Sequence, residues 1–97
     1  MVEHIVLFQL KPGASSAEKE AMIAALRGLR DKIDGIVDLT CGVNFSERNQ
    51  GHEIGLVVRF RDRAALEAYL PHPAHRGAVE AFIHPIRESA IVVDYDV

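Results

Sequence analysis

The 97-residue sequence has no tryptophan, a single cysteine and no excess of positive charge. The lone Cys41 excludes an internal disulfide and is typical of a reducing compartment. A net charge of −3 argues against the basic surface of a nucleic-acid-binding domain. No apolar run approaches the roughly 20 residues of a membrane span, and the N-terminal residues lack the pattern of a signal peptide. These absences predict a soluble cytoplasmic protein with no nucleic-acid or membrane partner.

Hydrophobic residues make up 48% of the chain, which is enough to build one core, so the sequence predicts a single domain over residues 1–97. Apolar and β-branched runs predict four strands, over residues 2–11, 36–46, 53–61 and 89–97. The second run contains Gly42, which predicts a β-bulge at that position. The first and last runs are apolar on both faces, which is typical of strands that are covered on both sides.

Helical signals fill the remaining segments of the chain. Ser15 is a good N-cap, and apolar residues at 3- and 4-residue spacing then predict an amphipathic helix of roughly five turns that ends at Gly35. Asp62 is expected to cap a short helix over residues 63–70. Pro73 suits the first turn of a further helix, which runs toward residue 84. Prolines thus split the second helical region in two.

The resulting order, β-α-β-β-α-β, predicts the α+β class and a ferredoxin-like sandwich, in which helices cover one face of an antiparallel sheet. A chain of this length has no further segment to cover the other face. Because that face is expected to be apolar, the sequence predicts a second copy of the chain as its partner, in a homodimer built through the open sheet face.

In this order the first and last strands are antiparallel neighbours. A register that pairs His4 with Asp94 also matches apolar residues along both strands: Val6 with Val92, Phe8 with Ala90, Ile5 with Val93 and Leu7 with Ile91. The register places an imidazole beside a carboxylate, which orients the histidine tautomer and raises its pKa. His4 and Asp94 are therefore candidate binding residues.

The run Tyr-Leu-Pro-His-Pro-Ala-His, residues 69–75, carries the strongest chemical signal. Tyr69 is expected to close one helix and His75 to sit in the first turn of the next, so that both face inward. The positive end of the helix dipole favours a neutral His75, which accepts a proton, while a nearby phenol donates to a developing oxyanion. The candidate catalytic residues are therefore Tyr69 and His75.

Simpler interpretations of these residues stay open. Histidines at a helix joint commonly bond to a backbone carbonyl, and a tyrosine at a helix end is often a half-buried anchor. His72-x-x-His75 supplies only two metal ligands, so no metal site is predicted. Cys41 is expected to be a core thiol.

The chain is identified as a member of the stress-responsive dimeric A/B-barrel (Dabb) family by its motifs. These are His4-x-Val6-x-Phe8-x-x-Lys11, Gly42 with Asn44, Tyr69-Leu70-x-His72-Pro73-x-His75 and Val92-x-Asp94-Tyr95. The resemblance covers essentially the whole chain. It implies ferredoxin-like protomers whose sheets pack face to face in a homodimer, forming a dimeric α/β barrel.

A plant polyketide cyclase of this family works without a cofactor, through a tyrosine and a histidine in the same run. The resemblance implies that His75 removes a proton beside a carbonyl, that Tyr69 steadies the enolate, and that His4 and Asp94 line the pocket. One departure is Ile54, which takes the place of a further pocket histidine in that cyclase.

Two classes of function follow. The first is a small-molecule pocket with cofactor-free acid–base chemistry on a carbonyl, aromatic or polyketide-like compound. The alternative is a non-catalytic homodimeric stress or interaction protein. Monooxygenases and haem-degrading enzymes share the predicted fold, but that is analogy of fold alone.

Overall fold

Four strands form one antiparallel sheet in the computed structural model, which describes residues 1–97. The strands are β1 (Val2–Leu10), β2 (Ile36–Val43), β3 (His52–Phe60) and β4 (Arg87–Asp96), in the order β2-β3-β1-β4. The helices are α1 (Ser16–Gly28), α2 (Arg63–Tyr69) and α3 (Pro73–Ala78). A 3₁₀ turn, η1 (Leu29–Asp31), follows α1, and a π-helical turn, η2 (Val79–Ile83), follows α3. This is the ferredoxin-like arrangement that the sequence predicts.

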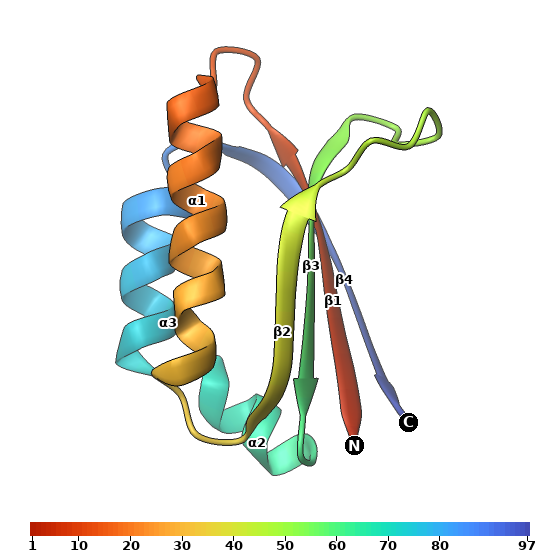
Figure 1. Cartoon of the computed structure of the whole chain (residues 1–97), viewed down its shortest axis with the longest axis vertical. Coiled ribbons are helices and arrows are strands. Elements are labelled where there is room, and N and C mark those ends of the chain that lie inside the picture. Colours follow the sequence, from red (N-terminus) through yellow and green to blue (C-terminus); the bar gives the residue numbers. More distant parts are fainter.

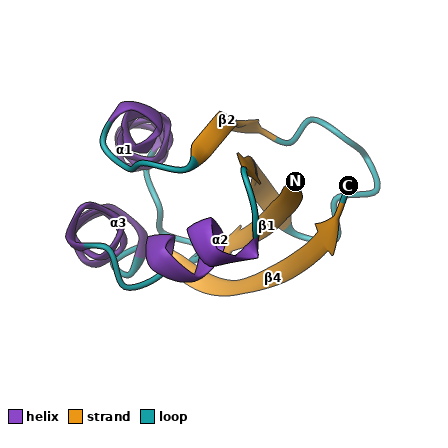
Figure 2. Cartoon of the chain, turned by 90° about the horizontal axis from the view of Figure 1, so that it is seen from below, coloured by secondary structure: helices purple, strands orange, loops and turns teal.

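The helices lie on one side of the sheet. Figure 1 shows α1 and α3 packed side by side against it and α2 across its lower end, near both chain termini. Figure 2, the view from below, shows no helix on the opposite side. None of the helices is long and apolar enough to cross a membrane.

Side-chain caps fix where the helices begin. Ser15 and Glu18 form a capping box at the start of α1, in which each side chain bonds to the other residue's backbone N–H. The Asp62 carboxylate accepts from the Ala65 N–H at 2.8 Å and opens α2. His72 takes the same role for α3, since its Nδ1 accepts from the Ala74 N–H at 3.0 Å.

The core lies between the helices and the sheet. Alternate residues of the strands face it, and α1 contributes its apolar stripe. The strand and helix residues that are nearly inaccessible to solvent include Val58, Phe60, Ile54, Met22, Leu26 and Tyr69. Cys41 is also buried there, as the sequence predicts for a core thiol.

The register of β1 and β4 is the predicted one. His4 pairs with Asp94, and the apolar pairs follow in the expected order along both strands. The predicted bulge at Gly42 is wrong: Gly42 pairs in register with Gly55 of β3, and the irregularity falls between Ile36 and Asp38. Two strand glycines that lie directly opposite one another need no extra residue between them.

The other face of the sheet is open in the single chain. Ile5 and Leu7 of β1 are only partly buried, and β4 is exposed along almost its whole length. Within one chain, the predicted two-sided burial of these strands therefore holds only for the helix-facing side of β1. Several large apolar side chains stay accessible on the open face, among them Ile91, Val93 and Tyr95.

Candidate functional site

The joint between α2 and α3 brings three candidate residues together beneath the helices. Tyr69 ends α2, and His75 lies in the first turns of α3. His4 reaches the same place from β1. The Tyr69 ring lies with its centroid 4.3 Å from that of His75 and 5.9 Å from that of His4. Phe60 of β3 closes the cluster, at 4.9 Å from Tyr69.

His4 and Asp94 form the pair that the register predicts. His4 Nδ1 lies 2.5 Å from Asp94 Oδ1, so the carboxylate fixes the imidazole ring. The His4 side chain is 7% exposed, whereas that of Asp94 is 43% exposed. Asp94 lines a surface cleft of about 270 Å³ beneath α2, together with Arg63 and Asp96. The pair thus connects the buried ring cluster with solvent.

The orientation of His75 is set by the backbone. Its Nδ1 lies 2.9 Å from the Leu70 carbonyl oxygen, to which it donates, so in the neutral ring Nε2 keeps its lone pair. Burial lowers the pKa of His75, and the nearby His4 and His72 lower it further, against the Leu70 bond that raises it. The sequence predicts a neutral His75, but its physical cause is chiefly desolvation rather than the dipole of the six-residue α3.

The Tyr69 hydroxyl is the single buried side-chain polar atom that lacks a hydrogen-bond partner. The residue is 0% exposed. Burial raises its pKa, and the neighbouring Cys41 thiol adds to the effect, so the phenol stays protonated. A buried hydroxyl without a partner is uncommon, because its desolvation is uncompensated. The arrangement leaves an O–H donor free for a bound molecule.

His75 also borders the outer surface. With Leu70, Val79 and His84 it lines a groove of about 470 Å³ at the helix joint. The buried Tyr69 lines neither this groove nor the cleft beside Asp94, so its hydroxyl is closed off from both openings.

Two of the remaining histidines bond to backbone groups. His72 caps α3, and His52 Nδ1 lies 3.1 Å from the Asn49 carbonyl. No group of three or more histidine, cysteine or acidic side chains has the geometry to hold a metal ion. Ile54 is a core residue, 1% exposed.

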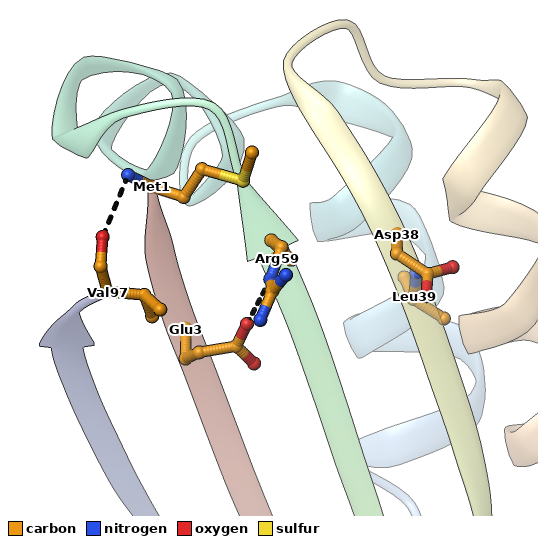
Figure 3. Close-up of polar contacts among 6 residues, drawn as sticks. All are labelled: Met1, Glu3, Asp38, Leu39, Arg59 and Val97. Atoms are coloured by element: carbon orange, nitrogen blue, oxygen red, sulfur yellow. Dashed lines mark hydrogen bonds and ion pairs between the residues drawn. The ribbon is translucent and has the colours of Figure 1, made fainter.

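The sequence reasoning missed an ion pair on the open face. Figure 3 shows Glu3 of β1 and Arg59 of β3 reaching toward one another, with Arg59 Nε donating to Glu3. Glu3 is only 8% exposed, although no helix covers this face. The available signal was the presence of opposite charges at the ends of two otherwise apolar strands.

Comparison with known proteins agrees with this architecture. The model of the stress-responsive A/B barrel domain, Dabb, matches residues 2–97. An uncharacterized protein of Streptomyces coelicolor is 31% identical, over 99% of both chains. Olivetolic acid cyclase of Cannabis sativa is 24% identical, over 97% of this chain and 94% of the cyclase.

A crystal structure of a dimeric protein of unknown function with a ferredoxin-like fold, from Bacteroides fragilis, superposes with a TM-score of 0.86. It is 29% identical and covers 99% of this chain and 95% of its own. The family match spans nearly the whole sequence and agrees with the fold in every element. The chain therefore belongs to the stress-responsive A/B barrel domain family.

Proposed function

We propose that the protein carries out cofactor-free acid–base chemistry on a small carbonyl compound, with His75 as the base and Tyr69 as the oxyanion donor. One observation carries the proposal: a neutral imidazole of fixed tautomer touches a buried phenol whose hydroxyl has no partner. Both groups are in the protonation state that this chemistry needs near neutral pH.

The reaction begins when Nε2 of His75 takes a proton from the carbon next to the carbonyl. The electron pair of the broken C–H bond forms the enolate double bond, and the carbonyl π pair moves onto oxygen. The Tyr69 hydroxyl donates a hydrogen bond to that oxygen. The imidazolium then returns the proton to the product, so no external acid or oxidant is needed.

His4 and Asp94 complete the proposed pocket as binding residues. The Asp94 carboxylate holds the His4 ring against Tyr69, and the cleft beneath α2 connects the carboxylate with solvent. A carbonyl or aromatic ligand of modest size is the kind of compound that the rings of Tyr69 and Phe60 would contact if the joint between α2 and α3 opened to admit it. The similarity to olivetolic acid cyclase, which is an enzyme by its name, supports a catalytic role for the pocket.

The test is proton exchange at carbon, which needs no knowledge of the natural substrate. The protein would be incubated in D₂O with a panel of aryl methyl ketones and 1,3-diketones, and loss of the α-proton signal followed by NMR. We expect exchange above the buffer rate, lost in His75→Gln and reduced at least tenfold in Tyr69→Phe.

The matched control for this experiment is His84→Gln. His84 is exposed on the same groove, so its loss should leave the exchange rate unchanged. Exchange that persists in His75→Gln would assign proton transfer to another group and overturn the proposal.

A second candidate, a non-catalytic homodimeric stress or interaction protein, is favoured by one observation. His75 bonds to the Leu70 carbonyl, which is what a histidine that only builds the helix joint would do. If His75→Gln lowers the stability of the protein and no ketone in the panel exchanges, this structural role is the better account.

For both the catalytic and the non-catalytic function, we propose that the protein is a homodimer that pairs through the open face of its sheet as a dimeric barrel. Two observations support it: the similar Bacteroides fragilis protein is described as dimeric, and large apolar side chains are exposed on β4. Sedimentation equilibrium on the wild-type chain tests it, and a monomer at all concentrations would contradict it.

A further inference from the structure

The open face is a regular grid, because all four strands keep one register across it. The grid has three rows, and each row takes one residue from β4, β1, β3 and β2 in that order. The rows are Tyr95-Glu3-Arg59-Asp38, then Val93-Ile5-Val57-Thr40, then Ile91-Leu7-Gly55-Gly42. The first row is charged, and the other two are largely apolar.

The side chains of the third row differ in size from one strand to the next. Ile91 and Leu7 stand up from β4 and β1, while Gly55 and Gly42 on β3 and β2 present bare backbone. A Cβ added at either glycine would meet no atom within 4 Å. Neither glycine has a positive φ, so a left-handed backbone does not account for glycine at these two positions. Within the third row, β4 and β1 thus carry a ridge, and β3 and β2 carry a hollow.

A two-fold axis that runs along the strands, midway between two facing sheets, matches this relief to itself. Such an axis keeps each row opposite the same row and reverses the order of strands. β1 then lies over the second copy's β3, and β4 over its β2. Leu7 meets the second copy's Gly55, and Ile91 meets its Gly42, so each ridge enters a hollow.

The same axis matches the charges in the first row. Glu3 lies over the second copy's Arg59, and Arg59 over its Glu3, so four charges alternate in sign at one end of the interface. Each Glu3–Arg59 pair within a chain is thereby completed by a second pair between chains. Within the apolar second row, Ile5 meets Val57.

The alternative face-to-face axis, at right angles to the strands, gives neither match. It places β1 over β1 and β3 over β3, with the row order reversed. The apolar third row would then face the charged first row, so Leu7 would meet the second copy's Glu3 and Gly55 would meet its Arg59. Arg59 would face the uncharged end of the sheet and lose its second acidic partner.

Resting on the homodimer of the proposed function, we infer that Gly42 and Gly55 form the docking hollow for Leu7 and Ile91 of the second copy. The two-fold axis along the strands also brings the free edge of β4 beside the free edge of the second copy's β2, running antiparallel. The pairing is therefore specified by relief and charge together, in addition to the general apolarity of the face.

The experiment fills the hollow in one chain and trims the ridge in another. Gly55→Val is compatible with the isolated chain, because the added side chain meets open space and valine favours strands. We expect its homodimer dissociation constant to rise at least tenfold in sedimentation equilibrium. The matched control is Gly77→Ala on α3, where a Cβ also meets nothing within 4 Å and no change is expected.

Mixing variants then tests the pairing itself by native mass spectrometry. A Gly55→Val chain mixed with a Leu7→Ala chain should form more heterodimer than random pairing gives, because the shortened side chain faces the filled position. An Ile91→Ala partner should form only the share of heterodimer that random pairing gives, since its change faces Gly42. Because the two changes sit in separate chains, the rescue cannot arise within one sheet.

The outcomes distinguish the ridge-and-hollow pairing from the existence of the homodimer. A Gly55→Val protein that dimerises like wild type, or rescue by Leu7→Ala and Ile91→Ala alike, overturns the ridge-and-hollow pairing while the homodimer stands. A wild-type protein that is monomeric overturns both. The tenfold loss with selective rescue by Leu7→Ala supports the pairing.

Discussion

The Tyr69 side chain combines two properties that oppose one another. Its ring packs against Phe60 and His75, which stabilises the fold, while its hydroxyl is buried without a partner, which destabilises it. A site that leaves such a group unpaired has a lower free energy of unfolding but keeps a hydrogen-bond donor for a ligand. Stability and activity are therefore expected to respond in opposite directions to loss of the hydroxyl.

Tyr69→Phe should raise the free energy of unfolding by about 1 kcal/mol, because it removes an uncompensated buried hydroxyl and keeps the ring. Urea denaturation of both proteins measures the change. Tyr95→Phe, studied under conditions where both proteins are monomeric, is the comparison, since that residue is 50% exposed on β4 in the single chain. A loss of stability in Tyr69→Phe would mean that the hydroxyl has a partner after all.

The pKa of His75 makes stability depend on pH in a stated direction. Burial holds the pKa of the folded state below the ordinary 6.5, so the unfolded chain binds the proton more readily. The contribution of neutral His75 to the free energy of unfolding is fully present above pH 6.5. It is lost as the pH falls through the lowered pKa of His75 in the folded state. His75→Gln should remove it, since glutamine also donates to the Leu70 carbonyl.

The measurement is the free energy of unfolding across pH 4 to 8 for wild type and His75→Gln. The difference between the two curves should shrink or reverse on the acid side. Curves that stay parallel throughout would show that His75 titrates like a solvent-exposed ring.

Residue-level chemistry was only partly visible in the sequence. The contact of His4 with Asp94 followed from alternation in β1 and β4, because one register satisfied every pair. The facing of Tyr69 and His75 followed from the prolines between their helices. The unpaired state of the Tyr69 hydroxyl did not, since it depends on every side chain of β2, β3 and the helices that surround it.

Among the secondary-structure elements, α2 holds Tyr69 in place, and a glycine outside the helix lets it pack closely. Gly35 has a φ of +90°, and a Cβ there would lie 2.7 Å from the Cβ of Ala65. Gly35 also accepts a backbone hydrogen bond from Arg61. The turn before β2 therefore touches α2 one turn ahead of Tyr69.

Gly35→Ala should lower the free energy of unfolding by about 2 kcal/mol or more, through both the left-handed backbone and the contact with Ala65. Thermal denaturation checks it. Adding Ala65→Gly should recover the part due to contact but not the part due to φ. Gly28→Ala, in a helical conformation with open space around it, should cost nothing.

Element order was predictable, and element details were less so. The apolar periods of the strands and the Asp62 and Pro73 signals gave the correct arrangement, with most boundaries within a few residues. The first helix is the exception: it was predicted to run to Gly35, but α1 ends at Gly28 and continues only as the 3₁₀ turn to Asp31. The bulge assigned to Gly42 was wrong because a glycine that breaks a strand and a glycine that leaves a surface bare look the same in one sequence. Only its partner across the sheet, Gly55, distinguishes them.

At the scale of the whole molecule, the charges of the first row are expected to determine which chains form a dimer. A Glu3→Arg chain carries two cations at that end of the face, and an Arg59→Glu chain carries two anions. Each should self-associate at least tenfold more weakly than wild type, because like charges meet across the two-fold axis.

Mixed together, the Glu3→Arg and Arg59→Glu chains should form a heterodimer close to wild-type affinity. Sedimentation equilibrium and native mass spectrometry of the mixture measure this. A heterodimer share no greater than random pairing gives would show that the charged row lies outside the interface.

The chain ends lie together at one end of the sheet, where the Val97 N–H donates to the Met1 carbonyl at 2.8 Å and the N-terminal amine lies near the Val97 carbonyl (Figure 3). Topologically, the polypeptide is almost a closed ring. A short linker that joins Val97 to Met1, with new ends opened in the exposed β2–β3 connection around Glu47, should give a circular permutant that folds to the same sheet. The same closeness of ends lets two copies follow one another in a single polypeptide without a long connecting segment.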